Sequence, residues 1–113
     1  MVVSNDIRWQ LVALGKSRKT RTSIFTPARP THWAPFEVRR PDSGEPFTPD
    51  GAWRFIVELL EGGVDVDVIE LDTPPARKGF VIIAEGFEGE KIYIKLQLGG
   101  GQVIGRSFHH STK

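Results

Sequence analysis

Hydrophobic and polar residues alternate strictly over residues 91–98, which read KIYIKLQL. Because successive side chains of a strand point to opposite faces, this pattern predicts a strand with one buried face and one polar face. Residues 64–71 alternate in the same way at their start, and residues 79–86 and 102–109 are further apolar segments bounded by turn-forming residues. We therefore expect an antiparallel sheet of about four strands.

A different hydrophobic period, of three to four residues, marks residues 49–61 as an amphipathic helix. Thr48 is a good N-cap, Pro49 has its φ preset for the first helical position, and Gly62 is placed to end the helix. The apolar side of this helix should pack on the sheet, with Trp53 in the core. Its apolar residues are Ala52, Trp53, Phe55, Ile56, Leu59 and Leu60.

The first third of the chain has weaker patterning. Residues 6–14 form a short apolar stretch that fits either a strand or a helical turn. Residues 15–29, GKSRKTRTSIFTPAR, carry too little apolar surface to order themselves, which predicts a flexible arm or loop. We therefore expect a basic N-terminal arm over residues 1–31, followed by a helix and an antiparallel sheet over residues 32–113.

The order of these elements, a helix followed by consecutive strands, indicates an α+β fold with one or two helices packed on one sheet face. A chain of 113 residues is about the size of one domain, so we expect a single domain. No apolar run approaches the roughly 18 residues that a membrane span needs, and a cytoplasmic location is the default expectation. The absence of cysteine excludes disulfides, thiolate nucleophiles and cysteine zinc sites.

The formal net charge of +1 hides a strong segregation along the chain. Residues 1–40 carry eight Lys or Arg against two acids, residues 41–90 carry three against twelve, and residues 91–113 carry four and no acid. A basic patch built from both ends of the chain would attract a polyanion such as RNA or DNA. The alternative is a solvated arm and a solvated sheet edge without a binding role.

The glycines between residues 98 and 102 decide how the last two strands pair. A two-residue turn would pair Tyr93 with Phe108 and put Phe108 on the polar face, whereas a three-residue loop would pair Tyr93 with Ser107. We expect the three-residue loop, Gly99–Gly101, because it buries both Phe108 and Ile104. This register turns Arg106 toward the buried side.

The same register gathers a group of polar side chains on one exposed surface. They are Tyr93, Lys95, Gln97, Ser107 and His109. Such groups suit a phosphodiester, because lysine and arginine hold phosphate oxygens and imidazole exchanges protons near neutral pH. Each has a simpler explanation as well, since tyrosine is a good strand former and an exposed lysine keeps a sheet face soluble.

The segment YIKLQL, followed by a short turn and VIGRSFH, resembles the last hairpin of the MqsR-type toxins of bacterial toxin–antitoxin systems, within the RelE-like group of mRNA interferases. The resemblance covers roughly residues 64–110. By the family's motif, Tyr93 takes the place of the active-site tyrosine and His109 that of the basic residue after Ser-Phe, which is lysine in MqsR itself. Lys78 is the nearest match to a lysine upstream of the hairpin.

This resemblance implies an endoribonuclease that cuts messenger RNA, on or off the ribosome, is neutralised by a cognate antitoxin protein, and needs no metal or cofactor. In the implied reaction a ribose 2′-OH attacks the adjacent phosphate, which leaves a cyclic phosphate and a 5′-OH. The reaction needs a base, an acid and cations around the phosphorane.

The candidate catalytic residues are Tyr93, His109, Lys95 and Arg106. The candidate RNA-binding residues are Lys78, Gln97, Ser107, Lys16, Arg18, Lys19 and Arg21. The alternative is a non-catalytic RNA- or protein-binding module on the same scaffold, because a fold does not fix a function.

Overall fold

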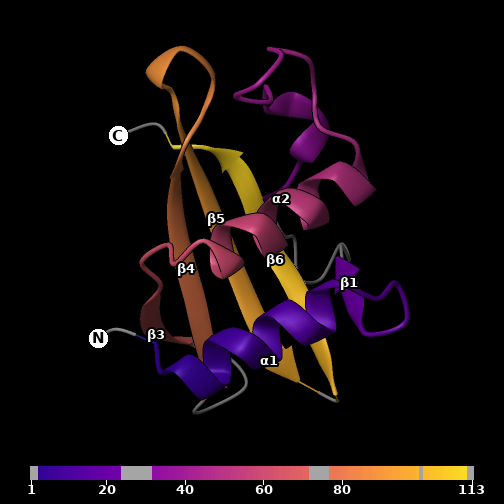
Figure 1. The fold of residues 1–113 in the computed structure, drawn as a ribbon, viewed down its shortest axis with the longest axis vertical. Helices are drawn as coiled ribbons and strands as arrows, with labels where there is room; N and C mark the ends of the chain where they lie inside the picture. Colours follow the sequence, from indigo (N-terminus) through magenta and orange to yellow (C-terminus); the bar gives the residue numbers. More distant parts are fainter. Residues whose placement is uncertain (1–2, 24–31, 72–76, 100, 112–113) are drawn as a thin grey trace.

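Two helices lie across one face of a mixed β-sheet in the computed structural model, which describes residues 3–23, 32–71, 77–99 and 101–111 (Figure 1). The helices are α1 (Asn5–Gly15) and α2 (Pro49–Glu61). The strands are β1 (Arg21–Ser23), β2 (His32–Trp33), β3 (Asp67–Leu71), β4 (Arg77–Glu85), β5 (Lys91–Gly99) and β6 (Gln102–His110). Two short 3-10 helices, η1 (Pro35–Glu37) and η2 (Phe87–Gly89), complete the elements.

The strand order is β1-β6-β5-β4-β3, with β2 also paired to β6. Strands β3 to β6 form an antiparallel meander, whereas β1 and β2 run parallel to β6. The α+β class is therefore confirmed. The expected sheet of about four antiparallel strands is too small, because β1 and β2 add parallel pairing at the outer edge of β6.

The helix expected over residues 49–61 is confirmed, and both of its ends lie where the sequence predicts them. The Thr48 hydroxyl accepts a hydrogen bond from the Gly51 amide at 2.9 Å, and Pro49 is the first helical residue. The apolar side of α2 is buried against the sheet, and Trp53 lies in the core as expected.

The N-terminal segment differs from the predicted arm. Helix α1 and strand β1 both lie within residues 1–31, while residues 24–31 lie outside the described residues. Leu11 and Val12 of α1 are buried, so the apolar stretch that fitted a strand or a helical turn forms a full helix. Tertiary packing supplies the apolar contacts that the local sequence lacks.

Hydrogen bonds from one arginine also link helix α1 to the end of α2. The Arg8 guanidinium donates to the Leu60 carbonyl at 3.0 Å and to the Val64 carbonyl at 2.7 Å. These are carbonyl groups at the C-terminal end of α2 and just beyond it, where intrahelical partners run out. Gly15 lets the two helices approach, because a Cβ there would lie 3.0 Å from the Val57 side chain.

The turn between β5 and β6 is not the predicted three-residue loop. Gly99 pairs with Gln102, which leaves two residues between the strands, and Gly101 has a φ of 75°. Ile104 consequently pairs with Gln97 on the face turned away from the helices, where it is half-buried. The expectation that Ile104 faces the core is therefore wrong.

A β-bulge interrupts the same hairpin farther from the turn. The pairing changes from Leu96 with Gly105 to Lys95 with Ser107, and Arg106 is the extra residue. A bulge bends the strand and re-aims its side chains, which allows both a two-residue turn and a buried Phe108. The expected burial of Phe108 is therefore confirmed, although by a different register.

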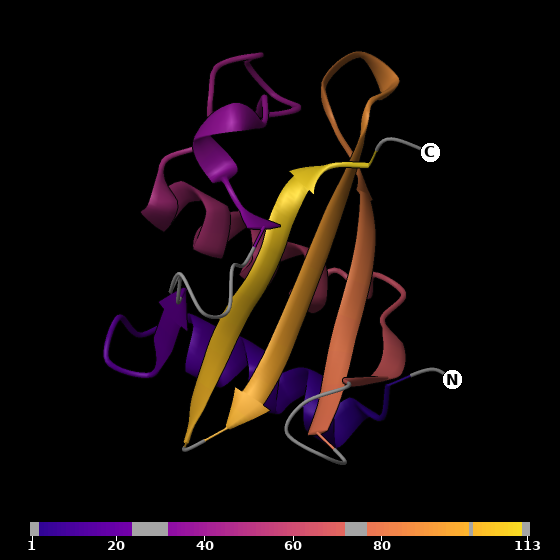
Figure 2. The ribbon, with the colours of Figure 1, turned by 180° about the vertical axis from the view of Figure 1, so that it is seen from behind.

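The two faces of the sheet have different neighbours, as the view from behind shows (Figure 2). The face toward α1 and α2 forms the core, with Ile82, Ile92, Ile94, Leu96 and Phe108 among its fully buried side chains. We call the opposite face of β4, β5 and β6 the back face; neither α1 nor α2 lies over it. No helix in the described part of the chain is long and apolar enough to cross a membrane.

Candidate functional site

The back face carries most of the predicted site residues. Strand alternation and the observed register place there Tyr93, Lys95, Gln97, Arg106, Ser107 and His109. These residues come from two adjacent strands, β5 and β6, so a rigid hairpin holds them rather than a loop. Six of the eleven predicted residues are thus brought together.

Tyr93 and His109 form the centre of this group. They are directly opposite each other on β5 and β6, and their rings stack with centroids 5.3 Å apart and planes inclined by 21°. The Nδ1 atom of His109 lies 2.8 Å from the His110 carbonyl oxygen. A carbonyl oxygen only accepts, so the ring donates from Nδ1 in this contact.

Arg106 joins the group through Gln97. The guanidinium donates to the Gln97 side-chain oxygen at 2.7 Å, which holds Arg106 toward the back face. The expectation that Arg106 points to the buried side is therefore wrong, because the bulge adds one residue and turns its side chain over. Gln97 is only 5% exposed, so this acceptor sits in a fixed position.

Lys95 and Ser107 lie between these two pairs. They are directly opposite each other on the strands, Lys95 half-buried and Ser107 only 2% exposed. The hydroxyl of Ser107 therefore has little surface for a ligand as large as a nucleotide, whereas Lys95 adds a positive charge next to Tyr93. The arrangement offers an imidazole, a phenol and two cations on one surface.

Lys78 is not part of this group. It is exposed near the start of β4 and pairs with Glu70 of β3 in the backbone register. Phe80, two residues farther along, is buried on the helix side, so alternation puts Lys78 on that side as well.

The four basic residues that follow α1 are not part of it either. Lys16 pairs with Glu61 at 3.0 Å, and Arg18 and Arg21 both pair with Asp50 of α2. Lys19 is exposed, and its backbone carbonyl accepts from the Gln102 side chain at 3.3 Å. Lys16, Arg18 and Arg21 thus lie beside α2, whereas Lys95 and Arg106 lie on the back face.

Sequence reasoning missed an apolar part of the back face. Ile83 of β4 is 47% exposed and lies directly opposite Tyr93, and Val81 lies opposite Lys95. The signal was the uninterrupted apolar run FVIIA, which must leave alternate side chains on the face without helices.

No cluster of three or more His, Asp or Glu side chains within the described ranges is arranged to hold a metal ion. Comparison of the chain with models of protein families, with curated proteins and with solved structures finds no match in any of the three.

Proposed function

We propose that this protein is an endoribonuclease of the MqsR- and RelE-like toxin type and that the back face cleaves messenger RNA. The observation that carries the proposal is the stacked pair of Tyr93 and His109, flanked by Lys95 and Arg106. A proton-transfer group, a hydroxyl and two cations are the groups that 2′-OH attack on a phosphodiester requires.

In the proposed reaction the His109 Nε2 atom takes the proton of a ribose 2′-OH. The 2′ oxygen forms a bond to the adjacent phosphorus, and the bond from phosphorus to the 5′ oxygen breaks. The Tyr93 hydroxyl donates a proton to the leaving 5′ oxygen, or positions the water that does so. The products are a 2′,3′-cyclic phosphate and a 5′-OH, and no oxidant or external group is consumed.

Lys95 and Arg106 stabilise the negative charge that builds up on the phosphorane oxygens. Arginine suits this role because its planar guanidinium binds two oxygens of one phosphate. The hydrogen bond from Arg106 to Gln97 fixes the guanidinium before the substrate arrives, so less reorganisation is needed in the transition state.

The decisive experiment is a digest of a defined RNA by the purified protein in excess chelator, followed by analysis of the fragment ends. We expect cyclic phosphate and 5′-OH ends with the wild-type protein. His109→Ala should lower the cleavage rate by about 10²-fold or more, the usual contribution of a positioned acid or base.

His110→Gln is the matched control, because His110 is opposite Ile92 on the helix side of the same strand. It should cleave as the wild type does. Equal loss in both histidine variants, with folding intact, would argue against a role for the back face. Intact RNA with wild-type protein, with and without ribosomes, would rule out the nuclease.

The second candidate is a non-catalytic RNA- or protein-binding module that uses the same face. The exposed Ile83 beside the aromatic pair favours it, because bases and apolar side chains both pack on such a platform. A protein that binds RNA without cleaving it, and loses affinity in Ile83→Ser, would support this candidate over the nuclease.

A further inference from the structure

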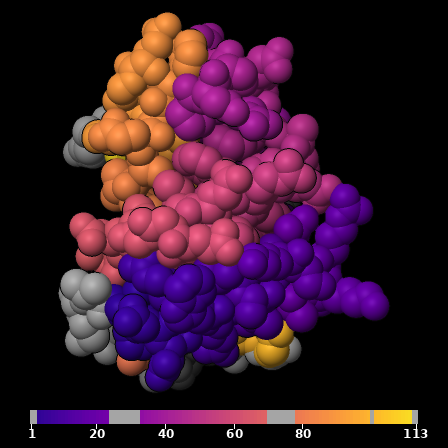
Figure 3. All heavy atoms as spheres, in the orientation of Figure 1, coloured from indigo at the N-terminus to yellow at the C-terminus, as the bar shows by residue number. Residues whose placement is uncertain are grey.

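A groove of about 440 Å³ lies between the C-terminal end of α1 and the outer side of α2. Figure 3 shows these two helices side by side on the surface, with α1 in indigo and α2 in pink. The groove is lined by Gly15, Lys16, Arg18 and Arg21 on one side and by Asp50, Arg54, Val57, Glu58 and Glu61 of α2 on the other. We call it the interhelical groove.

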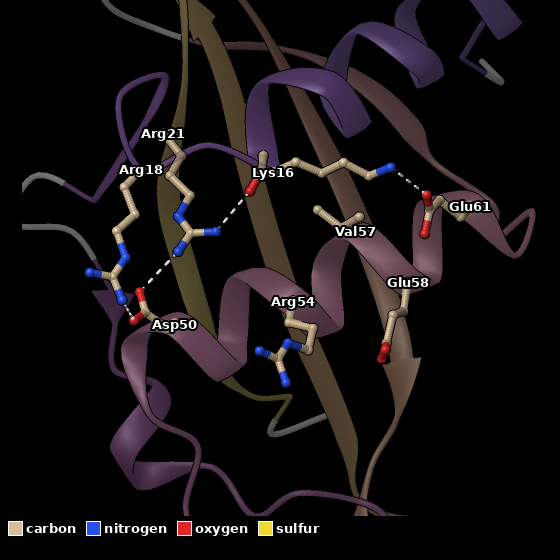
Figure 4. Close-up of a pocket in the computed structure, with 9 residues that line it drawn as sticks. Lys16, Arg18, Arg21, Asp50, Arg54, Val57, Glu58 and Glu61 are labelled. Carbon is tan, nitrogen blue, oxygen red and sulfur yellow. Dashed lines mark hydrogen bonds and ion pairs between the residues drawn. The ribbon is translucent and has the colours of Figure 1, made fainter.

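The charges in the interhelical groove are sorted by position (Figure 4). At the end near the start of α2, Arg18 and Arg21 pair with Asp50, and Arg54 adds a third guanidinium group one turn farther along α2. Toward the end of α2, Lys16 pairs with Glu61, and Glu58 adds a second carboxylate without an ion pair. One end therefore has an excess of positive charge and the other an excess of negative charge.

Two groove residues leave these excess charges available. Arg54 and Glu58 of α2 line the groove and are exposed. Within the described part of the chain, neither has an ion-pair partner, whereas the other charged groove residues all have one. Arg54 and Glu58 are thus the groups best placed to meet charges on a ligand.

The positive end is held in a fixed shape. The Arg21 side chain is only 12% exposed, donates to the Gly15 carbonyl and to Asp50, both at 2.9 Å, and lies over the Trp53 ring. A guanidinium has five N–H donors, so Arg21 keeps donors that these two bonds do not use. A preorganised cation loses little side-chain entropy when it binds an anionic group.

We propose that the interhelical groove binds a helical segment of a protein partner that carries one acidic and one basic side chain on the same face. The acidic side chain would pair with Arg54 and the guanidinium groups around Asp50, and the basic one with Glu58 and Glu61. Arg54 and Glu61 are seven residues apart, which corresponds to about 10 Å along a helix axis. The partner's two charges must match that spacing.

A protein segment fits this groove better than a nucleic acid does. RNA presents only negative charge along its backbone, so the carboxylates at the end of α2 would repel it. A helix laid into a groove between two helices is a common mode of peptide recognition, and charge pairs at its rim set the register and the choice of partner. The inference does not rest on the proposed nuclease, because the groove lies on the helix side of the sheet.

The test uses two synthetic alanine-rich helical peptides of identical composition, each with one glutamate and one lysine. In the first peptide the two charges are seven residues apart and share a face; in the second they are two residues apart and do not. Each peptide is titrated into the full-length 15N-labelled protein, and the amide shifts of Gly51 and Val57 report on the groove. The first peptide should shift these amides at lower concentration than the second.

Arg54→Gln should weaken binding of the first peptide about two- to fivefold, as expected for one exposed charge pair. Arg39→Gln is the matched control, because Arg39 is exposed, carries the same charge and does not line the groove. It should leave binding unchanged. The binding should also weaken as salt is added.

Three results would overturn the proposal. The first is equal binding of the two peptides, since binding would then not depend on the spacing of the two charges. The second is no shift of the groove amides with either peptide at millimolar concentration. The third is a stronger shift of the same amides with a single-stranded RNA oligonucleotide, which would identify a phosphate backbone as the ligand.

Discussion

Trp33 packs its ring directly against Gly105: a Cβ built on this glycine would lie 2.4 Å from Cζ3 of the ring. The ring belongs to β2 and the glycine to β6, so this contact packs the short parallel strand β2 against the antiparallel strands β3 to β6. Trp33 cannot easily move away, because its ring also packs on two others. The ring centroids are 5.1 Å apart for Trp33 and Trp53 and 5.5 Å apart for Trp33 and Phe108.

Gly105→Ala should therefore destabilise the protein by about 1–3 kcal/mol, the usual cost of overpacking a core. The free energy of unfolding, measured by denaturant titration, is the test. The double variant with Trp33→Leu should lose less than the sum of the two single losses, because a smaller side chain leaves room for the new methyl group. A fully additive pair of substitutions would contradict the proposed contact.

Arg8→Met should cost about 2 kcal/mol of unfolding free energy, because it keeps the apolar stem but leaves the Leu60 and Val64 carbonyls without their donor. Arg54→Met is the matched control on the surface of α2, where the change should stay within about 0.5 kcal/mol. Equal effects of the two substitutions would mean that the Arg8 hydrogen bonds add no more to the free energy of unfolding than hydrogen bonds of the same groups to water.

If the back face cleaves RNA as proposed and Gln97 positions Arg106, Gln97→Ala should impair that cleavage without unfolding the protein. We expect about a tenfold loss in kcat/KM, which corresponds to one lost hydrogen bond to a charged group. Gln97→Glu keeps an acceptor for Arg106 and should restore the positioning but weaken binding of the anionic substrate, so KM should rise while kcat recovers. If both variants lose the same amount of kcat/KM, and kcat does not recover in Gln97→Glu, Gln97 has only a structural role.

The pKa of Asp42 lies below its ordinary value of 3.8 because the Arg40 guanidinium donates hydrogen bonds to both carboxylate oxygens, at 3.1 and 3.0 Å. A group with a lowered folded pKa contributes stability above its unfolded pKa and loses that contribution as the pH falls through the folded value. An NMR titration of the Asp42 carboxyl carbon should give a midpoint below 3.8, and Arg40→Gln should raise it. A midpoint that Arg40→Gln leaves unchanged would contradict this cause.

Local sequence signals were sufficient for the elements whose chemistry is local. The N-cap Thr48, the first-turn Pro49 and the three-to-four-residue apolar spacing define α2 without any tertiary contact. Strict alternation likewise defines β5 and predicts which of its side chains face the core.

The pairing of β5 with β6 was beyond these signals, yet the candidate site was largely found. The predicted loop put Tyr93 opposite Ser107, whereas the structure puts it opposite His109, two residues farther on. Beyond the bulge the shift is two residues, which keeps Ser107, Phe108 and His109 on their predicted faces because strands alternate with a period of two. The sequence therefore placed His109 on the correct face, and only the β-bulge decided that it stacks on Tyr93.

The sequence by itself determined the α+β class, the α2 helix and the polar character of one sheet face, since each follows from periodicity and turn chemistry. Only the tertiary structure decided that Arg106 turns to the back face, that α1 is a full helix, and that Lys16, Arg18 and Arg21 meet the acids of α2. These outcomes depend on contacts between segments distant along the chain, such as Arg21 with Asp50. Local propensity carries no information about such contacts, because their energy exists only once the two segments are packed together.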